Sequence, residues 1–152
     1  MTFRIFVFSD SHRSLRNMYA AVDEHKPDLV IHLGDVMRDA EELSCAYPKQ
    51  AIVMVPGNCD GWFNDPLQKR LEIHGKTLLF SHGHIWRVKS GYGEALAAAR
   101  TAGADLVMFG HTHLACCTRE PDGLWVLNPG CARYSYGVVT ITDGEMHCEI
   151  VE

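Results

Sequence analysis

Five short polar clusters stand directly after apolar runs in this chain, and this pattern limits the fold more than any other feature. In chain order the clusters are Asp10-Ser11-His12, Gly34-Asp35, Gly57-Asn58-Cys59-Asp60, His82-Gly83-His84 and Gly110-His111-Thr112-His113. A short apolar run is typical of a buried strand, and ligands bind at the edge where the carboxyl ends of parallel strands meet. The pattern therefore predicts one sheet edge lined by carboxylate, amide and imidazole groups.

The first part of the chain alternates expected strands with expected helices. Strands are predicted at 3–8, 28–33 and 51–55, and helices at 14–25 and 40–46. Ser14 is the expected cap of the first helix, and Pro27 follows its end. This order of elements predicts parallel strands joined by right-handed crossovers.

Strands dominate the remainder of the chain. A hairpin is expected at 69–80 around His74-Gly75-Lys76, followed by a helix at 92–102 that Gly103 closes and a buried strand at 105–109. Antiparallel strands are then predicted at 114–119, 124–127, 137–142 and 146–151. Their expected turns are Pro121-Asp122-Gly123, Asn128-Pro129-Gly130 and Asp143-Gly144. Because no repeat or linker interrupts these elements, a single domain over residues 1–152 is expected.

Composition argues against several classes of protein. A net charge of −5 over 152 residues offers no basic field for an extended nucleic-acid surface. No apolar run approaches the roughly 18 residues that cross a membrane. The six cysteines form no C-x-x-C pair, and a chain of this size needs no disulfides, so reduced thiols in the cytoplasm are expected. The sequence leaves the oligomeric state open, a homo-oligomer included.

The spacing inside two clusters points to metal binding. In an extended segment, residues i and i+2 face the same side, so Asp10 with His12, and His111 with His113, would each present two ligands together. Two metals about 3.5–4 Å apart fit within that reach. Imidazole, carboxylate and amide ligands without cysteine suit Mn²⁺, Fe or Zn²⁺ better than Mg²⁺ or Ca²⁺. A hydrolytic site with two divalent metal ions is therefore predicted, with Mn²⁺ preferred and Fe, Ni or Zn as alternatives.

The order of the motifs carries a resemblance to a known family. Asp-x-His, Gly-Asp, Gly-Asn-x-Asp, a histidine before glycine and Gly-His-x-His together resemble the calcineurin-like metallophosphoesterase superfamily. Within it, the chain length and the Gly-Asn-Cys-Asp form are most similar to the small YfcE-like phosphodiesterase type. The resemblance spans essentially the whole chain and implies an α/β fold, a four-layer α/β/β/α sandwich with the two-metal site at one end.

The same resemblance implies ligands and an activity. The implied ligands of one metal are Asp10, His12, Asp35 and His113, and those of the other are Asp35, Asn58, His82 and His111. Asp35 would bridge the metals, since a carboxylate can give one oxygen to each. The implied enzyme is a phosphoesterase, with a phosphodiesterase favoured, in which metal-activated water attacks a small phosphate-ester substrate in line. A serine triad is disfavoured because neither Ser9 nor Ser11 lies in a G-x-S-x-G motif.

Three further residues are candidates for the catalytic site. Cys59 stands where many members of the superfamily carry a histidine that protonates the leaving oxygen, and a thiol there favours activated or diester substrates. It could equally be a small buried residue. Arg13 stands where relatives often have glycine, and it could clamp a phosphate or, slightly preferred, point to solvent. His84 could face the substrate or be an ordinary loop histidine.

A non-catalytic scaffold on the same fold is the alternative function. The resemblance includes the small retromer subunit, which keeps this sandwich and uses its surface to bind partners. The full set of expected ligand residues favours an enzyme, and the mixed ligand types disfavour a purely structural zinc site. Four histidines outside the motifs are expected to be solvated or hydrogen-bonded side chains: His25, His32, His74 and His147.

Overall fold

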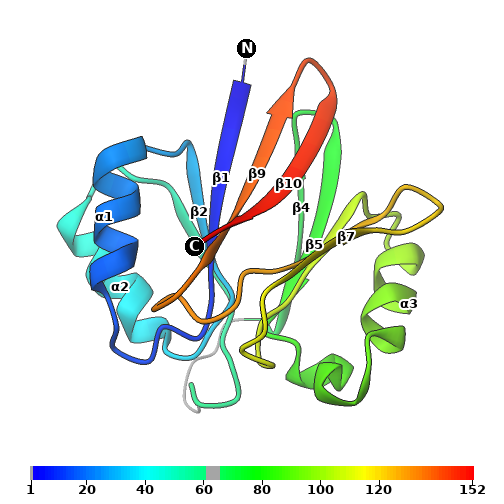
Figure 1. The fold of residues 1–152 in the computed structure, drawn as a ribbon, viewed down its shortest axis with the longest axis horizontal. Helices are drawn as coiled ribbons and strands as arrows, with labels where there is room; N and C mark the ends of the chain where they lie inside the picture. Colours follow the sequence, from blue (N-terminus) through cyan, green and yellow to red (C-terminus); the bar gives the residue numbers. More distant parts are fainter. Residues whose placement is uncertain (1, 61–65) are drawn as a thin grey trace.

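Two β-sheets pack face to face in the computed structural model, which describes residues 2–60 and 66–152 (Figure 1). The first sheet has the order β10 (Glu145–Val151), β9 (Tyr136–Thr142), β1 (Thr2–Phe8), β2 (Leu29–His32) and β3 (Ile52–Met54). The second has the order β4 (Gln68–Ile73), β5 (Lys76–Ser81), β6 (Leu106–Met108), β8 (Trp125–Asn128) and β7 (Cys116–Arg119). Both sheets mix parallel and antiparallel pairs.

Helices cover the outer face of each sheet. Helices α1 (Arg16–His25) and α2 (Met37–Ala46) pack on the first sheet through side chains that include Met18 and Leu43. Helix α3 (Gly93–Thr101) and the 3₁₀ turns His84–Trp86 and Val88–Ser90 lie beside the second sheet. A third apolar cluster fills the space between the sheets. This arrangement confirms the four-layer α/β/β/α sandwich.

The parallel opening of the chain is as predicted. Strand β1 pairs in parallel with β2, and β2 pairs in parallel with β3. The predicted hairpin is also present, since β4 and β5 pair antiparallel. Its two connecting residues, His74 and Gly75, both have positive φ (49° and 81°), as expected for a tight hairpin turn. These local patterns placed the ends of β1 to β5 to within one residue.

Two helix starts differ from prediction. Helix α1 begins at Arg16 with Leu15 as N-cap and no side-chain cap, so the predicted capping by Ser14 is wrong. The Ser14 N–H instead donates to Ser11 O (2.8 Å), which closes a turn after the first cluster. Helix α2 begins at Met37 rather than at residue 40, because the distant Asp60 Oδ1 accepts the Met37 N–H (2.8 Å).

The predicted turn at Asn128-Pro129-Gly130 does not join neighbouring strands. Strand β8 lies in the second sheet, parallel to β6, whereas β9 lies in the first sheet, antiparallel to β1. The segment between them therefore crosses from one sheet to the other. Within it, the Ala132 N–H donates to Ser9 O (2.9 Å), so the crossing segment lies beside the first polar cluster.

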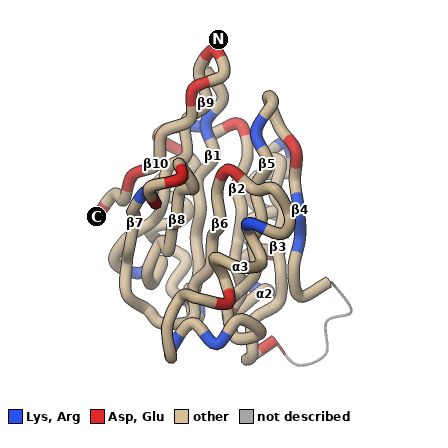
Figure 2. The backbone as a smooth tube through the Cα atoms, turned by 90° about the vertical axis from the view of Figure 1, so that its right-hand side faces the viewer, with Lys and Arg blue, Asp and Glu red and all other residues tan. Residues whose placement is uncertain are grey.

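Charged residues are spread over the molecule. In the view of Figure 2, Lys and Arg segments alternate with Asp and Glu segments and form no continuous basic stripe. None of the helices in residues 2–60 and 66–152 is both long and apolar enough to cross a membrane.

Candidate metal centre

All five polar clusters lie at one edge of the sandwich, at the lower end of the molecule in Figure 1. Three follow the parallel strands β1, β2 and β3, and two follow β5 and β6. Backbone hydrogen bonds join neighbouring clusters, from Asp10 N to Gly34 O (2.9 Å) and from Gly110 N to His82 O (2.8 Å). The two sheets meet where His82 Nδ1 donates to Leu33 O (2.9 Å).

Asp10 lies at the centre of this edge, with its two carboxylate oxygens in different environments. Oδ2 accepts hydrogen bonds from Ser9 Oγ (2.7 Å) and His111 N (3.0 Å). Oδ1 is buried and has no hydrogen-bond partner. The nearest basic atoms are Nε2 of His113 at 3.2 Å, of His82 at 3.7 Å and of His12 at 3.8 Å. A buried carboxylate oxygen without a donor is costly, and a cation would remove that cost.

Two groups of side chains converge closely enough to hold a metal ion. One consists of Asp10, His12 and His113, and the other of Asp10, Asp35 and His82, with the ligand atoms of each group within 4.8 Å of one another. The Nδ1–H of His82 is taken by Leu33 O, as is usual for a metal-binding histidine. Carboxylates and imidazoles in this arrangement fit divalent transition metals. Asp10 belongs to both groups and Asp35 to one, so bridging by Asp35 stays a prediction.

The remaining expected ligands are close to these groups. His111 Nδ1 lies 3.2 Å from His82 Nε2. Asn58 is exposed, and the next residue, Cys59, donates its N–H to Asp35 Oδ1 (2.9 Å). The structure thus brings both residues to the edge that carries Asp35 and His82, and their roles as ligands stay predictions.

The backbone of the Asp-x-His and His-x-His motifs is not extended. Asp10, His12, His111 and His113 have φ of 54°, 43°, 69° and 63°, all in the left-handed region. The prediction that extended backbone aligns residues i and i+2 is therefore wrong. Asp10 and His12 still converge, whereas His111 approaches His82 and His113 approaches Asp10.

Asp35 and His82 form a buried charged pair, with 3.4 Å between Asp35 Oδ2 and His82 Nε2. Burial alone would raise the pKa of Asp35, but hydrogen bonds and positive charge from His82, with the Cys59 N–H, outweigh it and lower that pKa. Burial alone would lower the pKa of His82, but Asp35 and the charge of Asp10 outweigh it and raise that pKa. Without a metal, the site therefore favours an ionised Asp35 beside a protonated His82.

His84 and Cys59 both lie at this edge. The His84 ring is 5.7 Å from that of His82 and 6.3 Å from that of His111, and its buried Nδ1 has no hydrogen-bond partner. Burial and the charge of His82 lower the pKa of His84. Cys59 is exposed, so its interpretation as a small buried residue is wrong. A hydrogen bond from its thiol to Asp35, with partial burial, raises the pKa of Cys59 and keeps the thiol protonated.

Arg13 is exposed, as the preferred sequence-based interpretation expects, but its guanidinium also has two carboxylate partners. Its Nη1 donates to Asp39 Oδ1 (2.6 Å), and its Nη2 donates to Glu42 Oε1 (2.8 Å), both on α2. The guanidinium is therefore paired with two carboxylates, although the side chain is 48% exposed. A role in clamping phosphate would require it to leave these partners.

Asp60 supports the site in a way that the sequence analysis missed. Its Oδ2 accepts the N–H groups of Asp35 (3.0 Å) and Gly57 (2.8 Å), in addition to the bond from Met37 to Oδ1. One buried carboxylate therefore joins the second and third clusters to the start of α2. Its position as the last residue of the Gly-Asn-Cys-Asp motif is the sequence signal that could have indicated this role.

A second set of buried polar side chains lies beneath the first cluster and was also missed. Ser11 Oγ donates to Asp39 Oδ2 (2.6 Å) and lies 3.0 Å from His32 Nε2, and His32 Nδ1 accepts the Gly34 N–H (3.1 Å). Burial lowers the pKa of His32 to about 4, so this imidazole is neutral at pH 7. His32 is hydrogen-bonded as predicted, but no spacing rule indicated Asp39.

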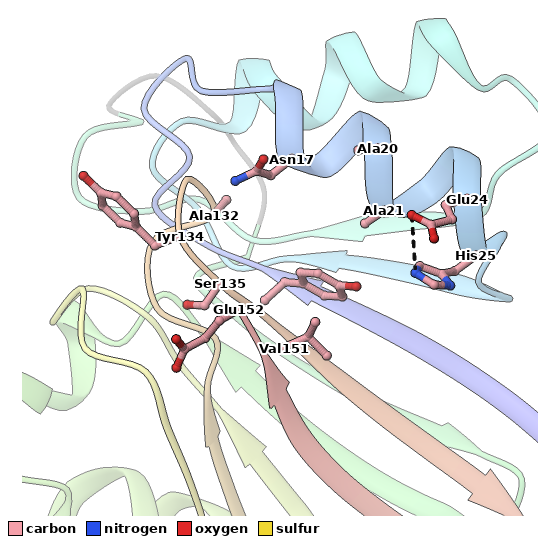
Figure 3. A pocket seen from close by; sticks show the side chains of 11 residues that line it. Asn17, Ala20, Ala21, Glu24, His25, Ala132, Tyr134, Ser135, Val151 and Glu152 are labelled. Atoms are coloured by element: carbon pink, nitrogen blue, oxygen red, sulfur yellow. Dashed lines mark ion pairs between the residues drawn. The ribbon is translucent and has the colours of Figure 1, made fainter.

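A separate cavity of about 310 Å³ lies between α1 and the segment that leads into β9 (Figure 3). Tyr134 lies at one end of it and the Glu24–His25 ion pair (3.9 Å) at the other. No residue that lines this cavity belongs to the five motifs. The candidate metal centre is therefore distinct from this cavity.

Comparisons with known proteins agree with the fold and show the family. Residues 3–144 match the model of the calcineurin-like phosphoesterase superfamily domain. The chain is 31% identical to the probable metallophosphoesterase YsnB of Bacillus subtilis, over 90% of this chain and 83% of the relative. It is 29% identical to phosphodiesterase MJ0936 of Methanocaldococcus jannaschii, over 97% of this chain and 98% of the relative.

Solved structures share the fold at lower sequence identity. A predicted phosphoesterase of Streptococcus pneumoniae TIGR4 aligns with a TM-score of 0.83 at 24% identity, over 99% of this chain and 90% of that one. Vacuolar Protein Sorting 29 (Vps29) of Cryptosporidium parvum aligns with a TM-score of 0.78 at 17% identity, over 99% and 97%. This chain belongs to the calcineurin-like phosphoesterase superfamily. Membership in this superfamily supports the interpretation of the protein as a metal-dependent phosphoesterase.

Proposed function

We propose that this protein is a phosphodiesterase with a binuclear metal centre, which acts on a small phosphate ester in the cytoplasm. The observation that carries the proposal is the buried Asp10 Oδ1, which has no hydrogen-bond partner and lies within 3.8 Å of three imidazole nitrogens. A cation satisfies this oxygen. Six free cysteines support a reducing compartment.

The proposed ligands divide between two metal positions. Asp10, His12, Asp35 and His113 would hold one, and Asp35, Asn58, His82 and His111 would hold the other. Two divalent cations, with Mn²⁺ preferred and Fe, Ni or Zn as alternatives, would activate water for in-line attack and neutralise charge on the phosphoryl oxygens. Without any metal, His82 is held in its orientation by donating from Nδ1 to Leu33 O, and Asp35 by accepting the Cys59 N–H at Oδ1.

The proposed preference for diesters with good leaving groups follows from the proton donors available. Cys59 takes the position of a histidine, and its raised pKa makes the thiol a poor acid at neutral pH. His84 is the group that we assign to orienting the phosphoryl group, because its ring lies 5.7 Å from that of His82 and 6.3 Å from that of His111. Arg13 would contribute to substrate binding only by leaving Asp39 and Glu42. Weak assistance to the leaving group favours substrates whose leaving oxygen departs unaided.

The likeness to Vps29 is the observation that favours the alternative, a scaffold that binds protein partners on the same fold. The two proposals differ in what they require of Asp10. An enzyme needs this buried oxygen to meet a metal, whereas a scaffold needs only the surface of the sandwich.

The test is hydrolysis of bis(p-nitrophenyl) phosphate by protein stripped of metal and then reloaded with Mn²⁺, Fe²⁺, Ni²⁺ or Zn²⁺. We expect no turnover after chelation, recovery that is greatest with Mn²⁺, and a stoichiometry of two ions per chain. An alkyl diester and an alkyl monoester, assayed in parallel, should react more slowly because their leaving oxygens are basic.

Each outcome bears on a different part of the proposal. Full turnover by stripped protein would exclude metal dependence, and a stoichiometry of one would exclude the binuclear centre. Equal rates on alkyl and aryl diesters would exclude the proposed limit on leaving groups. Absence of hydrolysis with every metal would favour the scaffold.

A further inference from the structure

The loop after β1 holds two successive non-glycine residues in a left-handed conformation. His12 has φ of 43° and Arg13 has φ of 67°. Side-chain residues adopt this region at a steric cost, and they usually do so singly. Two in a row require support from outside the loop, and the first of them is one of the proposed ligands.

Asp39 on α2 supplies that support. It is fully buried, and its Oδ2 accepts the backbone N–H of Arg13 (2.7 Å) while its Oδ1 accepts Nη1 of the same residue (2.6 Å). One carboxylate therefore holds both the backbone and the side chain of Arg13. Hydrogen bonds to a charged acceptor are about twice as strong as neutral ones, so this contact can offset the cost of the left-handed backbone.

Ser11 and His32 extend the contact to the second cluster. The neutral His32 accepts the Gly34 N–H at Nδ1, so its proton is on Nε2 and is donated to Ser11 Oγ (3.0 Å). The Ser11 hydroxyl then donates to Asp39 Oδ2 (2.6 Å). In this series of hydrogen bonds every donor points toward Asp39. Asp39 thus connects the loops of Asp10 and Asp35.

We propose that Asp39 is a positioning residue, which holds Arg13 in its left-handed conformation and thereby fixes His12 and Asp10 in the geometry that binds metal. Arg13 then belongs to the support of the loop rather than to the substrate-binding surface. The inference rests on the proposed function in that it takes Asp10 and His12 as ligands.

The experiment compares the effect of Asp39→Ala in two backgrounds, the natural chain and Arg13→Gly. The affinity of stripped protein for Mn²⁺ is measured by isothermal titration calorimetry. In the natural chain we expect Asp39→Ala to weaken Mn²⁺ binding at least tenfold, as is typical when a residue that orients metal ligands is lost. In the Arg13→Gly background we expect a loss below about threefold, because glycine adopts positive φ without support.

Glu42→Ala is the matched control. This substitution removes the other carboxylate that pairs with the same guanidinium and leaves the backbone N–H of Arg13 bonded to Asp39. The Glu42 side chain is 36% exposed. We expect its Mn²⁺ affinity to match that of the natural chain. A tenfold loss in this variant would mean that the guanidinium, and not the held backbone, controls the loop.

A second measurement separates this inference from the proposed function. Thermal unfolding in the presence of chelator should show a larger fall of Tm for Asp39→Ala in the natural chain than in the Arg13→Gly background. If Asp39→Ala does not fold, Asp39→Asn replaces it, and its fall of Tm should again be larger in the natural chain than in the Arg13→Gly background. Equal losses in both backgrounds would overturn the role of Asp39. Failure of the natural chain to bind Mn²⁺ would overturn the metal centre, while the unfolding data would still decide whether Asp39 supports Arg13.

Discussion

The two sheets contribute different loops to the metal centre, and these loops differ in how firmly their side chains are held. On the first sheet, the side chains of Asp10 and Asp35 are 0% and 4% exposed, and buried carboxylates bond the backbone around them. On the second sheet, the side chain of His82 after β5 is also 0% exposed, whereas after β6 that of His113 is 48% exposed and that of His111 is partly exposed.

The difference shows how one site can be both ordered and adaptable. Asp39 and Asp60 fix the first-sheet loops, because their buried carboxylates accept hydrogen bonds from the backbone N–H groups of these loops. The second-sheet loop after β6 is held by Asn128, whose Nδ2 donates to Gly110 O (3.2 Å) and Thr112 Oγ1 (2.9 Å). Neutral bonds of this kind are weaker than those to a carboxylate. We infer that Asp10 and Asp35 of the first sheet and the buried His82 of the second form the preformed part of the site, and that the loop after β6 is the part that adjusts.

The largest expected effect distinguishes a firmly held ligand from an exposed one. Asp10→Asn removes charge from both ligand groups, and we expect kcat/KM for the aryl diester to fall about 10³-fold, since metals supply several kcal/mol of stabilisation. His113→Ala removes one exposed imidazole, whose position water can take, and should cost about 10- to 100-fold. Metal content and circular dichroism of each variant provide the controls. Equal losses of kcat/KM in the two variants would mean that a firmly held ligand contributes no more than an exposed one.

A smaller effect compares the two anchors by stability. Asp60→Ala leaves three backbone donors without their acceptor, on Asp35, Met37 and Gly57, and should cost at least about 3 kcal/mol of unfolding free energy. Asn128→Ala leaves one such donor, Gly130 N, and should cost about 1–2 kcal/mol. Urea unfolding of stripped protein measures both. A larger loss for the asparagine variant would reverse the comparison.

A further effect is a pH dependence of stability that arises from His32, beneath the first cluster. His32 has a pKa of about 4 in the folded chain against 6.5, so the unfolded state binds more protons between these values and stability falls as pH falls through them. Between pH 7 and pH 5 this group should cost stripped protein about 2 kcal/mol. His32→Gln should lack this contribution. If both proteins lost the same stability over that range, His32 would not be the source.

The opposite sign is expected from His82 on the second-sheet side. Its pKa is raised in the folded chain, so its contribution is present below the ordinary histidine pKa and is lost as pH rises through the folded value. Acid therefore destabilises the stripped protein through His32 and stabilises it through His82. This is why the His32 variant, and not the natural chain alone, is needed to read the effect.

The parallel strands β1 to β3 and the polar groups that follow the strands can be predicted from the sequence alone. Apolar runs followed by polar clusters are local patterns, and a parallel β-α-β order brings its strand ends to one edge whatever the packing. Asp10, Asp35 and His82 were identified as site candidates from that placement together with the family resemblance, and the structure brings their side chains together. The same local logic located the hairpin of β4 and β5.

The way in which the clusters are held depends on contacts between distant parts of the fold. Asp39 and Asp60 lie 26 and 25 residues from the backbone groups of Arg13 and Asp35 that they bond, so no local pattern links them. The left-handed backbone of His12 and His113 depends on contacts made after the chain has folded, and the crossing of the segment after Asn128 depends on which sheet each strand joins. Propensity acts over neighbouring residues, whereas the support of this site comes from buried charges that distant segments bring together.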